Sequence, residues 1–92
     1  MPVPQTLQVL FYEYGDDMVE RRGPLRPAHL ELIQAYHGDG RLLMAGAYGD
    51  PPQGGLLVFS TAEAASAFAG EDPYVREGLV RGWRIEPWNV VT

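Results

Sequence analysis

Residues 6–14 are rich in β-branched and aromatic residues, and apolar side chains fall on both sides of the alternating pattern, which predicts a β-strand that is apolar on both faces. The two faces carry, respectively, Leu7, Val9 and Phe11, and Leu10, Tyr12 and Tyr14. Short apolar runs predict three further strands, over residues 41–48, 55–60 and 81–91. Pro87 lacks the N–H that a central strand needs, so the last strand is expected to bend or to run along a sheet edge near its end.

Helical periodicity and capping residues predict the segments between these strands. The longest helix is expected to begin with Pro27 at its first position and to run to about His37, before a glycine-rich turn. Another is expected to begin within Ser60-Thr61-Ala62-Glu63, which has the spacing of a capping box, and to end at Gly70. Shorter helical segments are expected over residues 16–22 and 72–78. The inner face of the helix after Ser60 is expected to carry Ala62, Ala65, Phe68 and Ala69.

The order of elements, β-α-β-β-α-β, predicts an α+β fold of the ferredoxin-like kind, with a four-stranded antiparallel sheet and helices on one face. Helices on a single face would leave the other face in water, yet the strands carry apolar side chains on both faces. A second copy of the chain is the expected cover, so we predict a homodimer that pairs sheet against sheet.

Composition narrows the classes of function. The 92 residues suffice for one domain spanning 1–92, with 46% hydrophobic residues. A net charge of −5 without a basic run disfavours binding to nucleic acid or to an anionic membrane. There is no cysteine, and the basic residues are all arginine, so thiol chemistry and lysine Schiff bases are excluded. No apolar run resembles a signal peptide or a membrane span, and the expected location is the cytoplasm.

His29 is the first candidate for chemistry, because it lies in the first turn of the 27–37 helix near the centre of its apolar stripe. A histidine on the apolar side of a helix has either a structural role or a role in chemistry, and the pattern leaves both interpretations open. The other histidine, His37, is eight residues away and thus about 12 Å along the helix, so no shared metal is expected. No cofactor is expected either, since no phosphate-binding glycine pattern occurs. The stripe consists of Leu25, Ala28, Leu32, Ile33, Ala35 and Tyr36.

Asp72 precedes a proline, which is a common position for a helix cap. A carboxylate that accepts from one imidazole nitrogen leaves the other nitrogen free to act as a base, and the two oxygens of a carboxylate could serve both purposes. Arg26 could hold an anionic oxygen, although pairing with surface Glu20 or Glu31 is the simpler interpretation.

Several tyrosines could line a pocket for a flat ring, although most aromatic residues of a small domain belong to its core. Only one or two are therefore expected at a site, and Tyr74 is the first choice because it lies next to Asp72. The tyrosines considered are Tyr12, Tyr14, Tyr48 and Tyr74.

Four segments occur in order along the chain: Arg26-Pro27-Ala28-His29-Leu30, Gly40-Arg41-Leu42-Leu43 followed by Ala45-Gly46, Asp72-Pro73-Tyr74, and Pro87-Trp88. Together they resemble the YciI-like (YCII-related) family over nearly the whole length. The resemblance implies a dimeric α+β barrel of ferredoxin-like subunits and an active site with a His–Asp dyad, here His29 and Asp72.

Two hypotheses of different class follow. The first is a cofactor-independent enzyme acting on a small cyclic or aromatic molecule, in which His29 moves a proton during isomerisation, elimination or dehalogenation and Asp72 orients it. Arg26 and Tyr74 would then bind the substrate. The second is a non-catalytic binding or accessory module that uses the same pocket.

Overall fold

The computed structural model describes residues 5–92 and confirms the expected order of elements. Four antiparallel strands form one sheet in the order β2-β3-β1-β4, so the two ends of the sheet are β2 and β4. No helix within residues 5–92 combines the length and apolar character needed to cross a membrane. The elements are β1 (Gln5–Tyr14), α1 (Met18–Arg21), α2 (Arg26–Gly38), β2 (Leu42–Tyr48), β3 (Gly54–Phe59), α3 (Ala62–Glu71), α4 (Pro73–Arg76) and β4 (Val80–Val90).

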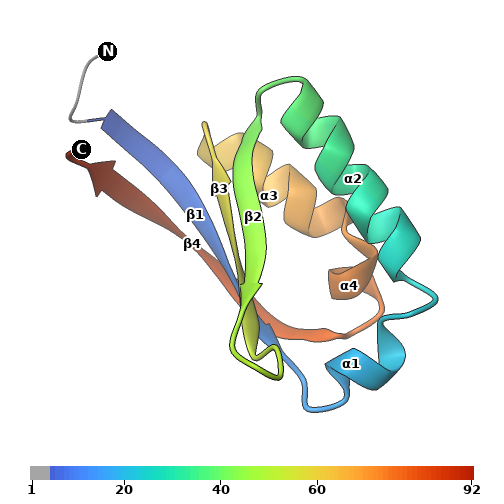
Figure 1. Ribbon diagram of the computed structural model, residues 1–92. Helices are drawn as coiled ribbons and strands as arrows, with labels where there is room; N and C mark the ends of the chain where they lie inside the picture. Colours follow the sequence, from blue (N-terminus) through green and yellow to red (C-terminus); the bar gives the residue numbers. More distant parts are fainter. Residues whose placement is uncertain (1–4) are drawn as a thin grey trace.

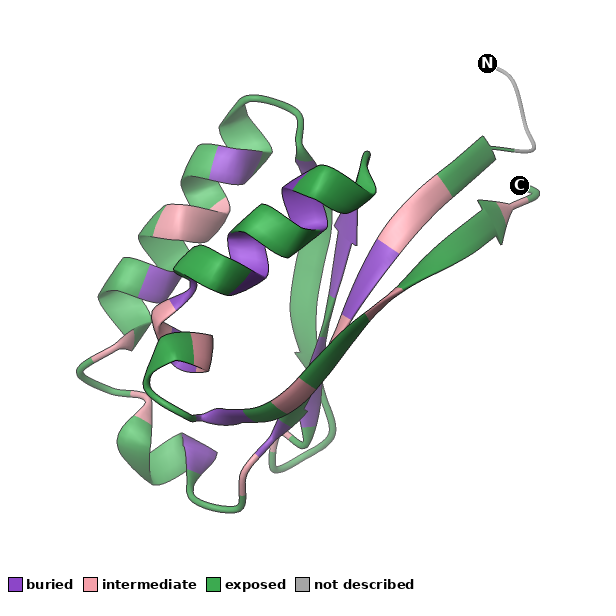
Figure 2. Cartoon of the chain, turned by 180° about the vertical axis from the view of Figure 1, so that it is seen from behind, coloured by how far each residue is buried: buried purple, intermediate pink, exposed green. Residues whose placement is uncertain are grey.

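The helices lie on one face of the sheet, which makes the described chain a two-layer α+β structure of the ferredoxin-like class (Figure 1). Buried residues follow the inner sides of the helices and the strand positions that face them (Figure 2). The sheet contributes Leu10, Tyr12, Leu57 and Phe59 to this core, all at most 3% exposed. As expected from its proline, β4 is an edge strand.

Two helices begin at residues that differ from the expected ones. α2 begins at Arg26, so Pro27 takes the second helical position, where its missing N–H also has no partner to lose. The cap of α3 is Thr61, whose hydroxyl accepts from the Ala64 N–H at 3.1 Å, whereas the Ser60 hydroxyl donates to the Gly40 carbonyl at 3.1 Å. The same helix continues past Gly70 to Glu71.

The buried stripe of α2 is narrower than its sequence pattern predicts. Ala28 and Ala35 are exposed, because they face a groove between α2 and the α3–α4 segment instead of the sheet. Ala62 is also exposed, and Ala64 is buried in its place at the start of α3. These alanines are small enough to be tolerated in water, so hydrophobicity alone did not reveal which of them would be covered.

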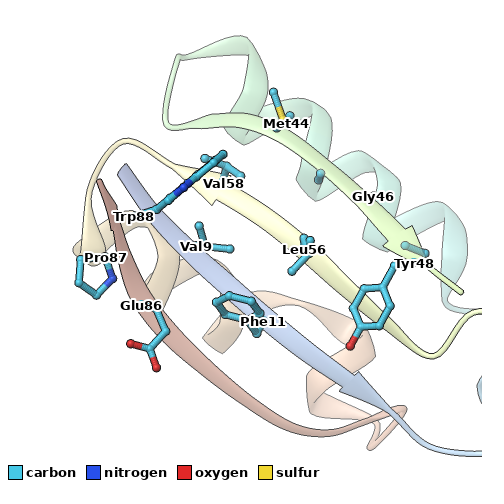
Figure 3. Close-up of a pocket in the computed structure, with 12 residues that line it drawn as sticks. Val9, Phe11, Met44, Gly46, Tyr48, Leu56, Val58, Glu86, Pro87 and Trp88 are labelled. Carbon is cyan, nitrogen blue, oxygen red and sulfur yellow. The ribbon is translucent and has the colours of Figure 1, made fainter. Parts of the chain in front are cut away.

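The face of the sheet opposite the helices, which we call the open face, is apolar and uncovered in the single chain (Figure 3). It forms a hollow of about 560 Å³ in which Glu86 is the one charged lining residue. Met44 is 66% exposed and Trp88 48% exposed there. The other large side chains of the open face are Val9, Phe11, Tyr48, Leu56 and Val58.

Candidate active site

Asp72 lies between α3 and α4, is fully buried, and caps α4. Its Oδ1 accepts the Tyr74 backbone N–H at 3.0 Å and also contacts His29 Nδ1 at 2.8 Å. The two interpretations that the sequence left open, helix cap and histidine partner, therefore hold together in one residue. The cap orients the carboxylate relative to α4, and the packing of α2 against this segment brings His29 to it.

His29 reaches Asp72 from the first turn of α2, and the structure joins two residues that are 43 positions apart. An ionised carboxylate only accepts hydrogen bonds, so His29 Nδ1 carries the proton in this contact and the opposite nitrogen, Nε2, has a free lone pair. Within residues 5–92, the Tyr74 hydroxyl is the sole buried side-chain oxygen or nitrogen without a hydrogen-bond partner. Nε2 also has no partner there and is not completely buried, although His29 is only 7% exposed, so its lone pair is available as a general base requires.

Tyr12 is a third member of this cluster that the sequence did not single out. From β1, its hydroxyl donates to Asp72 Oδ2 at 2.7 Å. Burial raises the pKa of Tyr12 well above its usual value, and the nearby Asp72 charge and hydrogen bond raise it further, so this hydroxyl keeps its proton. A clue existed in the strand pattern, because a tyrosine on the same face as Leu10 must bury its hydroxyl and find a partner for it.

Tyr74 holds the imidazole from one side. Its ring lies parallel to that of His29, with centroids 3.7 Å apart and an angle of 4° between the planes. Together with the Asp72 contact, this stacking restricts the rotation of the imidazole. The Tyr74 hydroxyl is the buried unpartnered group noted above, so this residue brings an unused polar group to the cluster.

A pocket of about 240 Å³ opens beside His29, between α2, the turn before it, and the strands β1, β2 and β3. Tyr12, Tyr14 and Tyr74 all line it, so more tyrosines reach the site than the one or two expected. Tyr48 instead lines the hollow of the open face.

Arg26, a sequence candidate, lines the pocket together with Arg22, which the sequence did not indicate. The simpler interpretation of Arg26 was wrong: within residues 5–92 it forms no ion pair with Glu20, Glu31 or any other acid. In the same part of the chain, no three potential metal-ligating side chains lie together.

Burial raises the pKa of Tyr14 to about 12, with contributions from Tyr74 and Asp72 that outweigh the opposing effect of Arg22 and Arg26. Within residues 5–92 the Tyr14 hydroxyl has no hydrogen-bond partner, and Tyr14 as a whole is 7% exposed.

This shift predicts loss of stability in alkali. Between pH 10 and 12 the unfolded chain loses the Tyr14 proton while the folded chain keeps it, so the free energy of unfolding falls as pH rises. The full contribution is on the order of 2 kcal/mol, and it is present below pH 10. We expect urea unfolding of Tyr14→Phe to show a weaker decline than wild type between pH 9.5 and 11. Parallel declines in the two proteins would contradict this assignment.

Taken together, the described chain is a ferredoxin-like α+β domain in which a buried carboxylate orients a histidine at the edge of a pocket. The YCII-related domain matches residues 6–89. Protein YciI of Escherichia coli and that of Shigella flexneri are each 35% identical to this chain over 96 residues, covering 92% of this chain and 98% of theirs. The chain belongs to the YCII-related family.

Solved structures support the fold. The 5-chloro-2-hydroxyhydroquinone dehydrochlorinase TftG from Burkholderia phenoliruptrix, solved in complex with 2,5-dihydroxybenzoquinone, has a TM-score of 0.73 and 17% identity. The alignment covers 90% of this chain and 93% of TftG. A conserved protein from Methanosarcina mazei has a TM-score of 0.54 and 14% identity, with 92% of each chain covered. At these identities the similarity establishes the shared fold.

Proposed function

We propose that this protein is a cofactor-independent enzyme that transfers a proton on a small cyclic or aromatic molecule, with His29 as the base and Asp72 as its orienting partner. The observation that carries the proposal is the pair of imidazole nitrogens in different environments: Nδ1 is 2.8 Å from a buried carboxylate, whereas Nε2 has no partner within residues 5–92 and belongs to a residue that lines a pocket. TftG, which has a similar fold, is a dehydrochlorinase of a chlorinated hydroxyhydroquinone, and this similarity supports enzyme chemistry on a small aromatic molecule.

The mechanism follows from these contacts. His29 Nε2 takes a proton from an acidic C–H or O–H of the bound molecule, and the electron pair of that bond stays on the substrate. The imidazolium that forms lies against the Asp72 carboxylate, which stabilises its positive charge. In an isomerisation the proton returns to another atom of the substrate. In an elimination the electron pair forms a new double bond, and a leaving group such as chloride departs with its own bonding pair.

A proton-exchange assay tests the proposal directly. Wild-type protein in D₂O is incubated with hydroxyquinones, chlorinated hydroquinones, cyclic ketones and lactones, and NMR follows exchange at carbon, product formation and the His29 ring resonances. We expect exchange or turnover well above the protein-free rate for at least one class, together with shifted His29 signals. Shifted signals without any exchange would favour the binding module. Proton exchange without any shift of the His29 ring resonances would contradict the role of His29 as the base.

We also propose that the open face pairs with the same face of a second copy, as its apolar surface requires cover. Light scattering after size exclusion should give twice the 10.2 kDa chain mass at micromolar concentration. Leu56→Glu places a charge on the open face at a side chain 40% exposed in the single chain, so we expect folded monomers. Val19→Glu, at a 43% exposed position on α1, is the matched control and should remain dimeric. A wild-type monomer, or an unaffected Leu56→Glu dimer, would contradict the pairing.

A further inference from the structure

We propose that the ligand of the His29 pocket is an organic anion, whose carboxylate or enolate oxygen is bound by the guanidinium groups of Arg22 and Arg26. The inference rests on the proposed function, because it specifies the charge of the molecule that the same pocket would take.

The chain places these two arginines side by side. Arg22 is the C-cap of α1, and its carbonyl accepts the backbone N–H of Leu25 at 2.9 Å and of Arg26 at 2.7 Å. This turn runs directly into the first residue of α2, so the arginines sit one helical turn apart and both line the pocket. Like charges at this spacing repel each other unless an anion lies between them.

Neither arginine is neutralised by the protein. Within residues 5–92, four of the seven arginines form ion pairs with carboxylates, and Arg22 and Arg26 are not among them. Arg76 is also unpaired there, but it lies in the groove between α2 and α4, outside the pocket. The paired arginines are Arg21 with Asp17, Arg41 with Asp39, Arg81 with Glu13 and Arg84 with Glu86.

The pocket lining contains these two arginines and no carboxylate, in a chain whose net charge is −5. Asp72 is nearby, but its oxygens are occupied by His29, Tyr12 and the Tyr74 N–H, and it is fully buried. A locally positive pocket on an acidic protein attracts anions selectively, because the rest of the surface repels them.

The other residues that line the pocket indicate the nature of the uncharged part of the anion. Met18, Ile33 and Leu57 provide apolar surface, and Tyr14, which also lines the pocket, adds a further hydroxyl as a hydrogen-bonding group. A volume of about 240 Å³ suits a molecule built around a single ring. The same guanidinium groups would also stabilise the negative charge that develops on an oxygen when His29 removes a proton from an adjacent carbon.

Binding of benzoate and of its neutral counterpart benzamide tests the inference, since the two probes have nearly the same shape. NMR titration of wild-type protein should show benzoate binding at least about tenfold more tightly than benzamide, with shifts at His29 and at the Arg22 and Arg26 side chains. Raising the salt concentration should weaken benzoate binding alone.

The variants give the decisive comparison. Arg22→Gln and Arg26→Gln should each weaken benzoate binding about threefold to tenfold, as expected for partly screened guanidinium contacts, and the double variant should remove the preference over benzamide. Arg76→Gln changes the net charge of the protein by the same amount as each single variant and should bind benzoate as wild type does.

Equal affinity for the two probes, an unaffected double variant, or no benzoate binding at millimolar concentration would overturn the inference. Failure of this inference can be distinguished from failure of the proposed enzyme function. Benzoate binding that depends on Arg22 and Arg26, without any proton exchange in the earlier assay, would support the anion site and contradict the proposed proton-transfer function. Proton exchange on neutral substrates that is insensitive to both arginines would support the enzyme function and contradict the anion site.

Discussion

Replacing His29 with glutamine should lower the rate of proton exchange by about 10²- to 10⁴-fold, the usual contribution of a positioned general base. Glutamine has no basic lone pair at neutral pH, but its amide can still donate to Asp72 and leave the buried carboxylate with a partner. The fold should therefore survive the change. The measurement is the same D₂O exchange assay, with circular dichroism and unfolding curves to verify the fold.

Two comparisons separate a chemical role of His29 from a structural one. His29→Ala removes the ring and opens space beside the pocket, so added imidazole should restore part of the exchange rate in that variant, which no purely structural role would produce. His37→Gln is the matched control, because His37 binds only the Leu42 carbonyl through Nδ1, at 2.9 Å, and lines none of the pocket. Wild-type rates in His29→Gln would remove His29 from the chemistry.

Replacing Asp72 with alanine should lower the free energy of unfolding by about 3–5 kcal/mol, a large share of the stability of a small domain. The change removes the cap of α4 and leaves the Tyr12 hydroxyl and His29 Nδ1 buried without an acceptor. Urea unfolding at one fixed protein concentration measures the loss, since association of the chain would add a concentration dependence.

Asp72→Asn should cost less, about 1–2 kcal/mol, because the amide oxygen can still accept from Tyr74 and His29, and the Tyr12 hydroxyl can turn to accept instead of donating. The exchange rate should nevertheless fall strongly, since the neutral amide no longer stabilises the imidazolium. Asp39→Ala, at an exposed Asp39–Arg41 pair, should change stability little. A nearly unchanged stability of Asp72→Ala would contradict the buried hydrogen-bond cluster.

The strands and the fold class could be predicted from the sequence because their signals are local. The alternation of apolar residues in β1 and the proline in β4 reflect the pleat of a strand and the loss of an N–H, which do not depend on distant residues. Errors occurred where competing local signals were equally good. Ser60 and Thr61 can both cap a helix, and only contact of the Ser60 hydroxyl with the Gly40 carbonyl decides between them.

The candidate site could be predicted in part. His29 and Asp72 each carry a local signature, a histidine on the inner side of a helix and an acid before proline, and the family resemblance joined them. Tyr12 could not be recognised as the third member because its partner is 60 residues away. Arg22 and Arg26 carry no local sign that they lack acidic partners, since a nearby glutamate is enough in the sequence to suggest a pair.

The order of the elements, the two apolar faces of the sheet and the residues able to do acid–base chemistry follow from the amino-acid sequence, because hydrophobic period, capping and side-chain type are properties of short segments. Which of these side chains meet depends on the three-dimensional packing. The Asp72 carboxylate receives its donors from β1, α2 and α4 at distances of 2.7–3.0 Å, a convergence set by how the helices pack on the sheet. The same packing leaves Nε2 of His29 and two unpaired arginines facing one pocket.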